Sequence, residues 1–151
     1  LSNWNTSNVT NMSYMFGDGD TGSNIKKIDG ITNWDVSKVA NMQGMFYTCS
    51  ITDLSAISKW NVSNVTCMDS MFLGCEIQDL NAISNWNVSN VTSVSQMFQG
   101  NPITDASGIN NWNITKVTDF VGMFYLCPTH PEFTKVTGTW DESGTFTPTT
   151  K

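Results

Sequence analysis

A thirteen-residue segment that recurs five times constrains this chain more than any other feature. Its clearest copy is Trp60–Phe72, WNVSNVTCMDSMF, and the other copies begin at Trp4, Trp34, Trp86 and Trp112. Every copy ends with a Phe twelve residues after its Trp, and successive Trp residues are 30, 26, 26 and 26 positions apart. A fixed period of this length is typical of stacked repeats, each too small to bury its own apolar face. The sequence therefore predicts a repeat solenoid.

Apolar residues within each copy recur at helical spacing. In the third copy these are Val65, Met68, Met71 and Phe72, which would lie on one helical face. A Ser or Thr three residues after each Trp can cap the first free N–H groups of a helix. We expect a short helix from about Asn64 to Leu73 and at the equivalent positions of the other copies.

A second apolar run precedes the next Trp with a spacing of three, as in Ile51, Leu54 and Ile57. The intervening residues are small or polar, and a β-branched Ile recurs three residues before the Trp. We expect a short parallel strand over about Ser55–Ser58 and its equivalents. Stacked copies would then hydrogen-bond to one another at about 4.8 Å per repeat.

One position of the repeat, fifteen residues after the Trp, holds Cys49, Cys75, Asn101 and Cys127. A small polar side chain there can form hydrogen bonds with backbone groups of a turn inside the stack. Neighbouring Cys residues of this column would keep their Cβ atoms about 4.8 Å apart. This distance exceeds the usual Cβ separation in a disulfide. We therefore expect four free thiols, with the three in this column buried and inert.

Two groups of acidic residues raise the question of cation binding. Asp53, Asp79 and Asp105 form a column in which turn capping is the favoured interpretation and a cation between the carboxylates is the alternative. The first copy carries an insertion within Gly17–Asn24 whose Asp-x-Asp pattern resembles a calcium loop but lacks its late Glu. We interpret it as a plain surface loop, and the cation question stays open for both groups.

The pattern ends after Cys127. Two proline residues interrupt regular structure at PTHPEF, and two β-prone runs then flank the turn sequence DESG. We expect a hairpin that pairs Lys135–Trp140 with Thr145–Thr147 and covers the last repeat. The predicted organisation is a five-repeat solenoid over 1–127, a cap over 128–147 and the start of a linker over 148–151.

Charge and composition exclude several classes of function. The chain has seven basic residues against 13 acidic ones, for a net charge of −6, which argues against nucleic-acid partners. No apolar run approaches the roughly 20 residues that span a bilayer, so we expect no membrane insertion by this segment. The single histidine, His130, is expected to face solvent. We find no phosphate loop, metal-type Cys/His spacing or nucleophilic triad, and expect no enzyme activity, cofactor or metal.

The unit WNVSNVTxMxxMFxxC, followed by an Ile/Leu run, resembles the BspA-like leucine-rich-repeat surface proteins, especially their Trp- and Met-Phe-rich branch in mycoplasma-type lipoproteins. The resemblance covers about Leu1 to Cys127. Departures include Asn101 and Gly19 in place of the Cys, and Val94 and Phe120 in place of the middle Met. The resemblance implies a secreted or surface-anchored bacterial protein that acts in adhesion. The resemblance implies a role and a location for this chain but identifies no binding residues.

Together these observations predict a right-handed, leucine-rich-repeat-like α/β solenoid with one short parallel strand and one short helix per repeat. Because the chain begins inside a repeat, we interpret it as a piece of a longer protein whose signal or anchor lies elsewhere. The expected function is non-enzymatic binding of an extracellular protein or glycan. A passive spacer and a targeting module of a larger secreted enzyme are the alternatives.

The expected contact surface is the strand face of the solenoid, where a broad and gently curved surface would be presented. Its outward side chains are small or polar and recur just before each Trp: Thr32, Asn33, Ser58, Lys59, Ser84, Asn85, Asn110 and Asn111.

Overall fold

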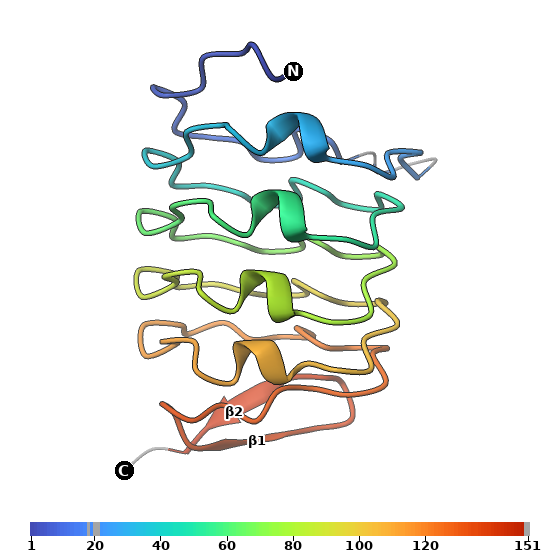
Figure 1. Ribbon diagram of the computed structural model, residues 1–151. Helices are drawn as coiled ribbons and strands as arrows, with labels where there is room; N and C mark the ends of the chain where they lie inside the picture. The colour runs from blue at the N-terminus through green and yellow to red at the C-terminus, as the bar shows by residue number, and fades with distance from the viewer. Residues whose placement is uncertain (18, 20–21, 150–151) are drawn as a thin grey trace.

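A computed structural model describes residues 1–17, 19 and 22–149 of the chain. Most of these residues are in turns and coil. The regular elements are four short 3-10 helices and two β-strands, which pair with each other (Figure 1): η1 (Asp29–Ile31), η2 (Ser55–Ile57), η3 (Asn81–Ile83), η4 (Ser107–Ile109), β1 (Gly138–Trp140) and β2 (Phe146–Pro148). The described residues contain no α-helix and no parallel strand within the repeats. The predicted α/β leucine-rich-repeat-like solenoid is therefore wrong.

The segment that we expected to be a strand forms the 3-10 helices instead. The Ile57 N–H donates to the Leu54 carbonyl oxygen at 3.1 Å, and the Trp60 N–H donates to Ile57 at 3.2 Å. A 3-10 helix has three residues per turn, so Leu54 at the N-cap and Ile57 at the end of η2 lie on the same buried side. Ile51 is also buried but lies in the coil before the helix. The spacing of three between Leu54 and Ile57 is therefore the period of a 3-10 helix, although we had interpreted it as an imperfect strand pattern.

The segment that we expected to be an α-helix is a run of coil and turns that bonds to the next copy of the repeat. Met68, Ser70 and Phe72 donate their N–H groups to carbonyl oxygens 25 residues further on, at 2.8–3.0 Å. An α-helix needs those N–H groups for its own carbonyls four residues earlier. Ser70 also has a φ of 54°, a left-handed conformation that interrupts a regular strand. The contacts between copies therefore remain isolated parallel bridges, such as Cys67 with Ser93.

Successive copies lie one above another as layers of coil (Figure 1). Phe46, Phe72 and Phe98 are fully buried, and neighbouring rings in this column are 5.6 Å apart and nearly parallel. The Trp of each later copy of the repeat donates its indole N–H to a carbonyl oxygen of the preceding layer, as Trp86 does to Ile57 at 3.0 Å. The repeated aromatic and Met positions thus form part of the core, in which each Phe ring stacks on those of the adjacent layers.

The antiparallel hairpin predicted after the repeats is present but shorter than expected. Strand β1 pairs with β2 through Gly138↔Pro148, Thr139↔Thr147 and Trp140↔Phe146. The hairpin packs on the last copy of the repeat, where the Phe124 N–H donates to the Gly144 carbonyl oxygen at 3.0 Å. Figure 1 shows this sheet at the end of the stack that lies farthest from the N-terminus.

Candidate functional site: a polar column and a charged groove

The predicted contact residues follow the 3-10 helices directly, and not a strand as expected. Each helix is succeeded by a pair of polar side chains, at 32–33, 58–59, 84–85 and 110–111. Ser58 and Asn110 are half-buried and the other six residues are exposed. Because the helices recur layer by layer (Figure 1), the pairs form one exposed column, which we call the polar column.

Each polar pair is held between buried apolar residues. Ser58 and Lys59 stand between Ile57 and Trp60, which are 0% and 5% exposed. The Ser58 hydroxyl also donates to the carbonyl oxygen of Ser55 at 2.8 Å, and Thr32 makes the equivalent bond to Asp29 at 3.0 Å. The backbone of the column is therefore fixed by the core beneath it.

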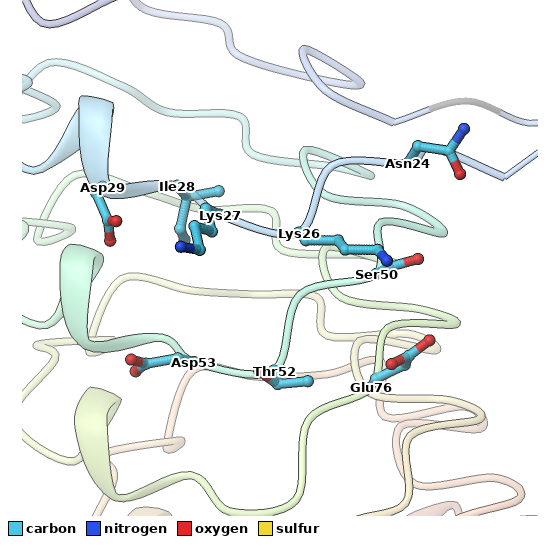
Figure 2. A pocket seen from close by; sticks show the side chains of 9 residues that line it. All are labelled: Asn24, Lys26, Lys27, Ile28, Asp29, Ser50, Thr52, Asp53 and Glu76. Atoms are coloured by element: carbon cyan, nitrogen blue, oxygen red, sulfur yellow. The ribbon is translucent and has the colours of Figure 1, made fainter.

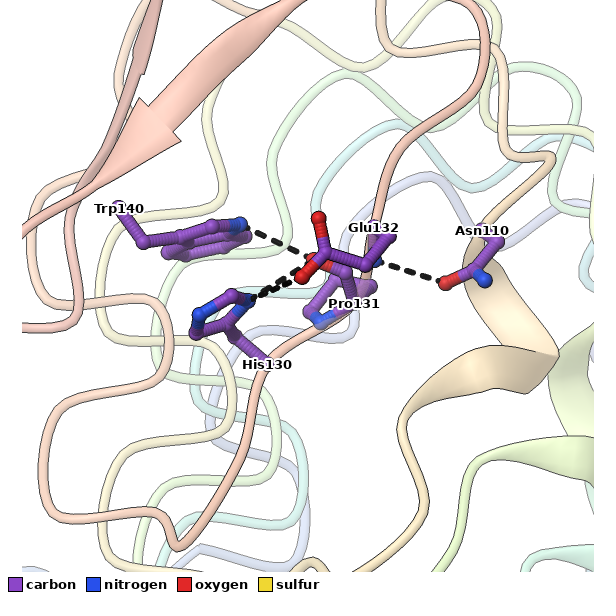
Figure 3. A network of polar contacts seen from close by, with 5 residues as sticks. All are labelled: Asn110, His130, Pro131, Glu132 and Trp140. Atoms are coloured by element: carbon purple, nitrogen blue, oxygen red, sulfur yellow. Dashed lines mark hydrogen bonds and ion pairs between the residues drawn. The ribbon is translucent and has the colours of Figure 1, made fainter.

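The last pair of the column is occupied by the C-terminal segment. The Asn110 side-chain oxygen accepts the Glu132 N–H at 2.9 Å (Figure 3), and the Asn111 side-chain oxygen accepts the Thr134 hydroxyl at 2.6 Å. Our sequence interpretation grouped Asn110 and Asn111 with the other pairs. The structure leaves the pairs after η1, η2 and η3 without such a cover.

A groove of about 550 Å³ lies on the other side of η1 and η2, before the helices begin (Figure 2). The lining is almost entirely polar and comes from the first three copies of the repeat: Asn24, Lys26, Lys27, Ile28, Asp29, Ser50, Thr52, Asp53 and Glu76. Figure 2 shows Lys26, Lys27 and Asp29 on one segment, with Thr52, Asp53 and Glu76 on the segments below it.

The charged side chains of this groove are not neutralised by one another. Within the described part of the chain the one ion pair joins His130 to Glu132, far along the sequence from the groove. Asp53 accepts the Ser55 N–H at 2.8 Å, and this backbone hydrogen bond lowers the pKa of its carboxyl, with a smaller contribution from the Ser55 hydroxyl. The groove therefore presents ammonium groups and carboxylates that form no ion pair with another described residue.

Sequence reasoning missed this groove, although a signal was present. Lys26 and Lys27 occupy register positions that hold Thr52 and Asp53 in the next copy. The adjacent lysines are thus a departure from an otherwise uniform repeat, next to the insertion. Asp18, Asp20 and Thr21 of that insertion lie outside the described residues, so the resemblance of Gly17–Asn24 to a calcium loop stays open.

The column of aspartates caps turns, as the favoured interpretation predicted. Asp79 accepts the Asn81 N–H at 3.1 Å, and Asp105 accepts both the N–H and the hydroxyl of Ser107, at 3.0 and 2.6 Å. Each bond closes the turn that opens a 3-10 helix. No group of three or more His, Cys, Asp or Glu in the described ranges is arranged to hold a metal ion.

The predicted free thiols are confirmed for all four cysteines. The Cys75 thiol donates to the Phe46 carbonyl oxygen at 3.2 Å, and the Cys127 thiol donates to Phe98 at 3.1 Å. Burial raises the pKa of Cys127 to about 11 and raises the pKa of Cys75 further. These thiols satisfy turn carbonyls, as expected for this position. Cys127 is only half-buried, which differs from the expectation.

His130 is exposed, as predicted, and is held by the C-terminal segment. Its ring stacks on Trp140 with centroids 4.9 Å apart, and its Nδ1 lies 3.6 Å from a carboxylate oxygen of Glu132 (Figure 3). The Trp140 indole N–H donates to the Pro131 carbonyl oxygen at 3.0 Å. The histidine therefore serves the packing of this segment on the last layer.

A family model described as "Mycoplasma protein of unknown function, DUF285" matches the chain over residues 1–54 and 20–140. These two matches together span the repeats and most of the C-terminal segment. The chain belongs to this family. The description of the DUF285 family assigns no activity, and no curated protein and no solved structure matches the chain. The family assignment supports the repeat but leaves the narrower BspA-like resemblance without independent support.

The DUF285 chain contains no helix that is both long and apolar enough to cross a membrane, in the residues that the structure describes.

Proposed function

We propose that this DUF285 chain is a non-enzymatic binding module of a secreted or surface-attached protein, and that it contacts an extracellular protein or glycan through the polar column. The observation that carries the proposal is the recurrence of an exposed polar pair after η1, η2 and η3, on a backbone that the core holds in place. The resemblance to BspA-like adhesins supports the proposed location and role.

The physical argument rests on rigidity and repetition. A surface whose backbone is already ordered loses little conformational entropy when a ligand binds. Equivalent pairs on successive layers can also engage neighbouring units of one extended ligand, so several weak contacts add. Buried Ile and Trp residues flank every pair, which makes the column well suited to such binding.

The test is a binding screen of the protein against arrayed matrix proteins, mucins and glycans. A column variant carries Asn33→Glu, Lys59→Glu and Asn85→Glu. A matched control carries Thr66→Glu, Thr92→Glu and Thr118→Glu, which place three negative charges at exposed positions on a different segment of the layers. We expect a saturable hit that the column variant loses and the control retains.

The other outcomes are equally informative. A hit that survives in the column variant would contradict the polar column as the contact surface. A complete absence of hits would favour the alternative of a passive spacer, because a spacer needs a uniform stack and no ligand.

A further inference from the structure

We infer that the groove lined by the segments that lead into η1 and η2 binds a peptide segment in which a basic side chain lies close to an acidic one. This inference adds a second site to the proposed binding role, on the opposite side of the 3-10 helices from the polar column. It rests on the shape of the groove, on the sign and placement of its charges and on the position of its lysines in the repeat.

The groove is large enough for a few side chains of a ligand. Its volume of about 550 Å³ falls within the usual range of binding pockets, which runs from roughly 300 to 1,000 Å³. The segments that line it are anchored by hydrogen bonds between layers, since the Ser50 N–H donates to Ile25 at 2.9 Å and the Glu76 N–H donates to Ile51 at 3.0 Å. The lining backbone is therefore formed before any ligand arrives.

Both lysines of the groove lie on one segment together with Asp29, and the other two carboxylates lie on other segments. Lys26 and Lys27 come from the first copy of the repeat, whereas Asp53 and Glu76 come from the second and third. Neither lysine forms an ion pair or a hydrogen bond with another described residue. A ligand with one acidic and one basic group can match both sets, whereas a ligand of a single sign is attracted by one set and repelled by the other.

Other classes of ligand fit the groove less well. Three carboxylates face two ammonium groups in the lining, and the whole chain carries a net charge of −6, so the field disfavours polyanions. Ile28 is the one apolar residue of the lining and is buried, and no aromatic ring lines the groove on which a sugar could stack. A peptide with side chains of both signs is the ligand that meets all of these conditions.

The experiment titrates the isotope-labelled protein with four capped pentapeptides and follows the backbone amide resonances. The peptides have glycine spacers and carry one glutamate and one lysine, two glutamates, two lysines, or no charge. We expect the mixed peptide to bind tightest and to shift the amides of Lys26, Lys27 and Asp53. High salt should weaken this binding, because the Debye length falls to about 3 Å at 1 M.

Variants separate the two sets of charges. We expect Glu76→Gln, and the double variant Lys26→Gln with Lys27→Gln, to weaken the mixed peptide about twofold to fivefold for each charge removed. Lys135→Gln removes an exposed lysine of the C-terminal segment and is the matched control, with unchanged affinity expected. Equal affinities for the four peptides, or no shift at the groove amides at millimolar peptide, would overturn the inference.

Two further arms keep this inference separate from the proposed function. A hyaluronan tetrasaccharide tests an acidic glycan, and a larger shift of the groove amides with this probe than with the mixed peptide would contradict the peptide assignment. The column variant should bind the mixed peptide normally. If that variant loses the array hit while no peptide binds the groove, the proposed function stands and the groove inference fails.

Discussion

At the scale of single residues, left-handed backbone recurs at two positions of the repeat among the residues that the structure describes. Ten residues after the Trp, φ is positive at Tyr14, Gly44, Ser70, Gln96 and Gly122; fourteen residues after it, φ is positive at Thr48, Gly74, Gly100 and Leu126. Only some of these residues are glycine. A side chain at such a position costs roughly 1–2 kcal/mol, because its Cβ approaches the following carbonyl oxygen.

Fourteen residues after the Trp, some layers have glycine and others have a residue with a side chain. Two substitutions at this position should therefore change the free energy of unfolding in opposite directions. Gly100→Ala should lower the free energy of unfolding by about 1–2 kcal/mol, because φ is 77° while an added Cβ would have only ordinary contacts at 3.9 Å. Leu126→Gly should raise it by about 0.5–1 kcal/mol, because Leu126 is 67% exposed and loses little burial. Chemical denaturation measures both, and a stabilising Gly100→Ala would refute the assignment of strain.

Asn101 occupies the thiol position in its layer and makes more hydrogen bonds than a thiol does. Its side-chain NH₂ donates to the carbonyl oxygens of Phe72 and Phe98 at 2.7 and 2.9 Å, and its oxygen accepts the Ile77 N–H at 3.0 Å. The residue is 0% exposed. Removing this side chain leaves the buried Ile77 N–H without a partner, whereas the Phe72 and Phe98 carbonyl oxygens keep the backbone N–H groups of Cys75 and residue 101 as donors at 3.2 Å.

We therefore expect Asn101→Ala to lower the free energy of unfolding by about 1–3 kcal/mol, which is roughly the cost of one unsatisfied buried group. Asn101→Cys reproduces the neighbouring layers and should lose less than half as much. Denaturant unfolding of both variants, followed by Trp fluorescence, provides the measurement. Equal losses would show that side-chain volume, and not hydrogen bonding, governs this position.

At the scale of elements, η2, η3 and η4 are each preceded by an aspartate that accepts the N–H of the first residue of the helix. The Ser107 hydroxyl, followed by the Ser107 backbone N–H, lowers the pKa of Asp105. For Asp53, which precedes η2, the Ser55 backbone N–H, followed by the Ser55 hydroxyl, lowers the pKa. Because these folded-state pKa values lie below the unfolded value of about 4, the carboxylates stabilise the fold above that pH. The stabilisation is lost as the pH falls through the folded-state pKa.

This linkage predicts that Asp105→Asn reduces the loss of stability on acidification. The Asn side chain keeps the oxygen that accepts the Ser107 N–H but cannot titrate. Denaturation at a series of pH values from neutral to below 3 should show a shallower decline for the variant than for the wild type. Asp105→Ala, which also loses the acceptor, should be less stable than Asp105→Asn at every pH. A steeper decline in Asp105→Asn would contradict the assigned sign.

The elements also show how far periodicity predicts structure. The apolar spacing correctly placed Ile51, Leu54 and Ile57 inside, but a spacing of three in a short segment suits both a bent strand and a 3-10 helix. In the segment 64–73 the spacing matched an α-helix, yet the N–H groups of Met68 and Ser70 bond to the next layer. Burial was therefore predictable from the sequence, whereas the direction of the backbone hydrogen bonds was not.

At the scale of the whole molecule, the two ends of the stack differ. Trp4 is 55% exposed at the first layer, whereas Trp112 is 2% exposed. At the last layer, Phe146 of β2 is 4% exposed and its ring lies 5.2 Å from those of Phe120 and Phe133. Since each layer contacts mainly its neighbours, stability should propagate locally from layer to layer.

We therefore expect Phe146→Ala to cost about 3–5 kcal/mol and to open the end of the stack before its middle. Hydrogen exchange should accelerate first at Phe124, whose N–H donates to Gly144, and much less at Ile77, whose N–H is held by Asn101 in the middle layers. Val121→Ala at a 60% exposed side chain on the last layer is the control, with little effect expected. Uniform acceleration would instead indicate one cooperative unit.

The sequence by itself determined the period of the repeat, the buried columns, the capping aspartates, the thiol position and the C-terminal hairpin. These features depend on local chemistry or on strict repetition, so a single chain displays them. Only the tertiary structure decided which N–H groups bond within a layer and which bond to the next, because short segments gain most of their hydrogen bonds from neighbours distant in sequence. For the same reason the groove of Lys26, Asp53 and Glu76 became visible only when three layers were placed together.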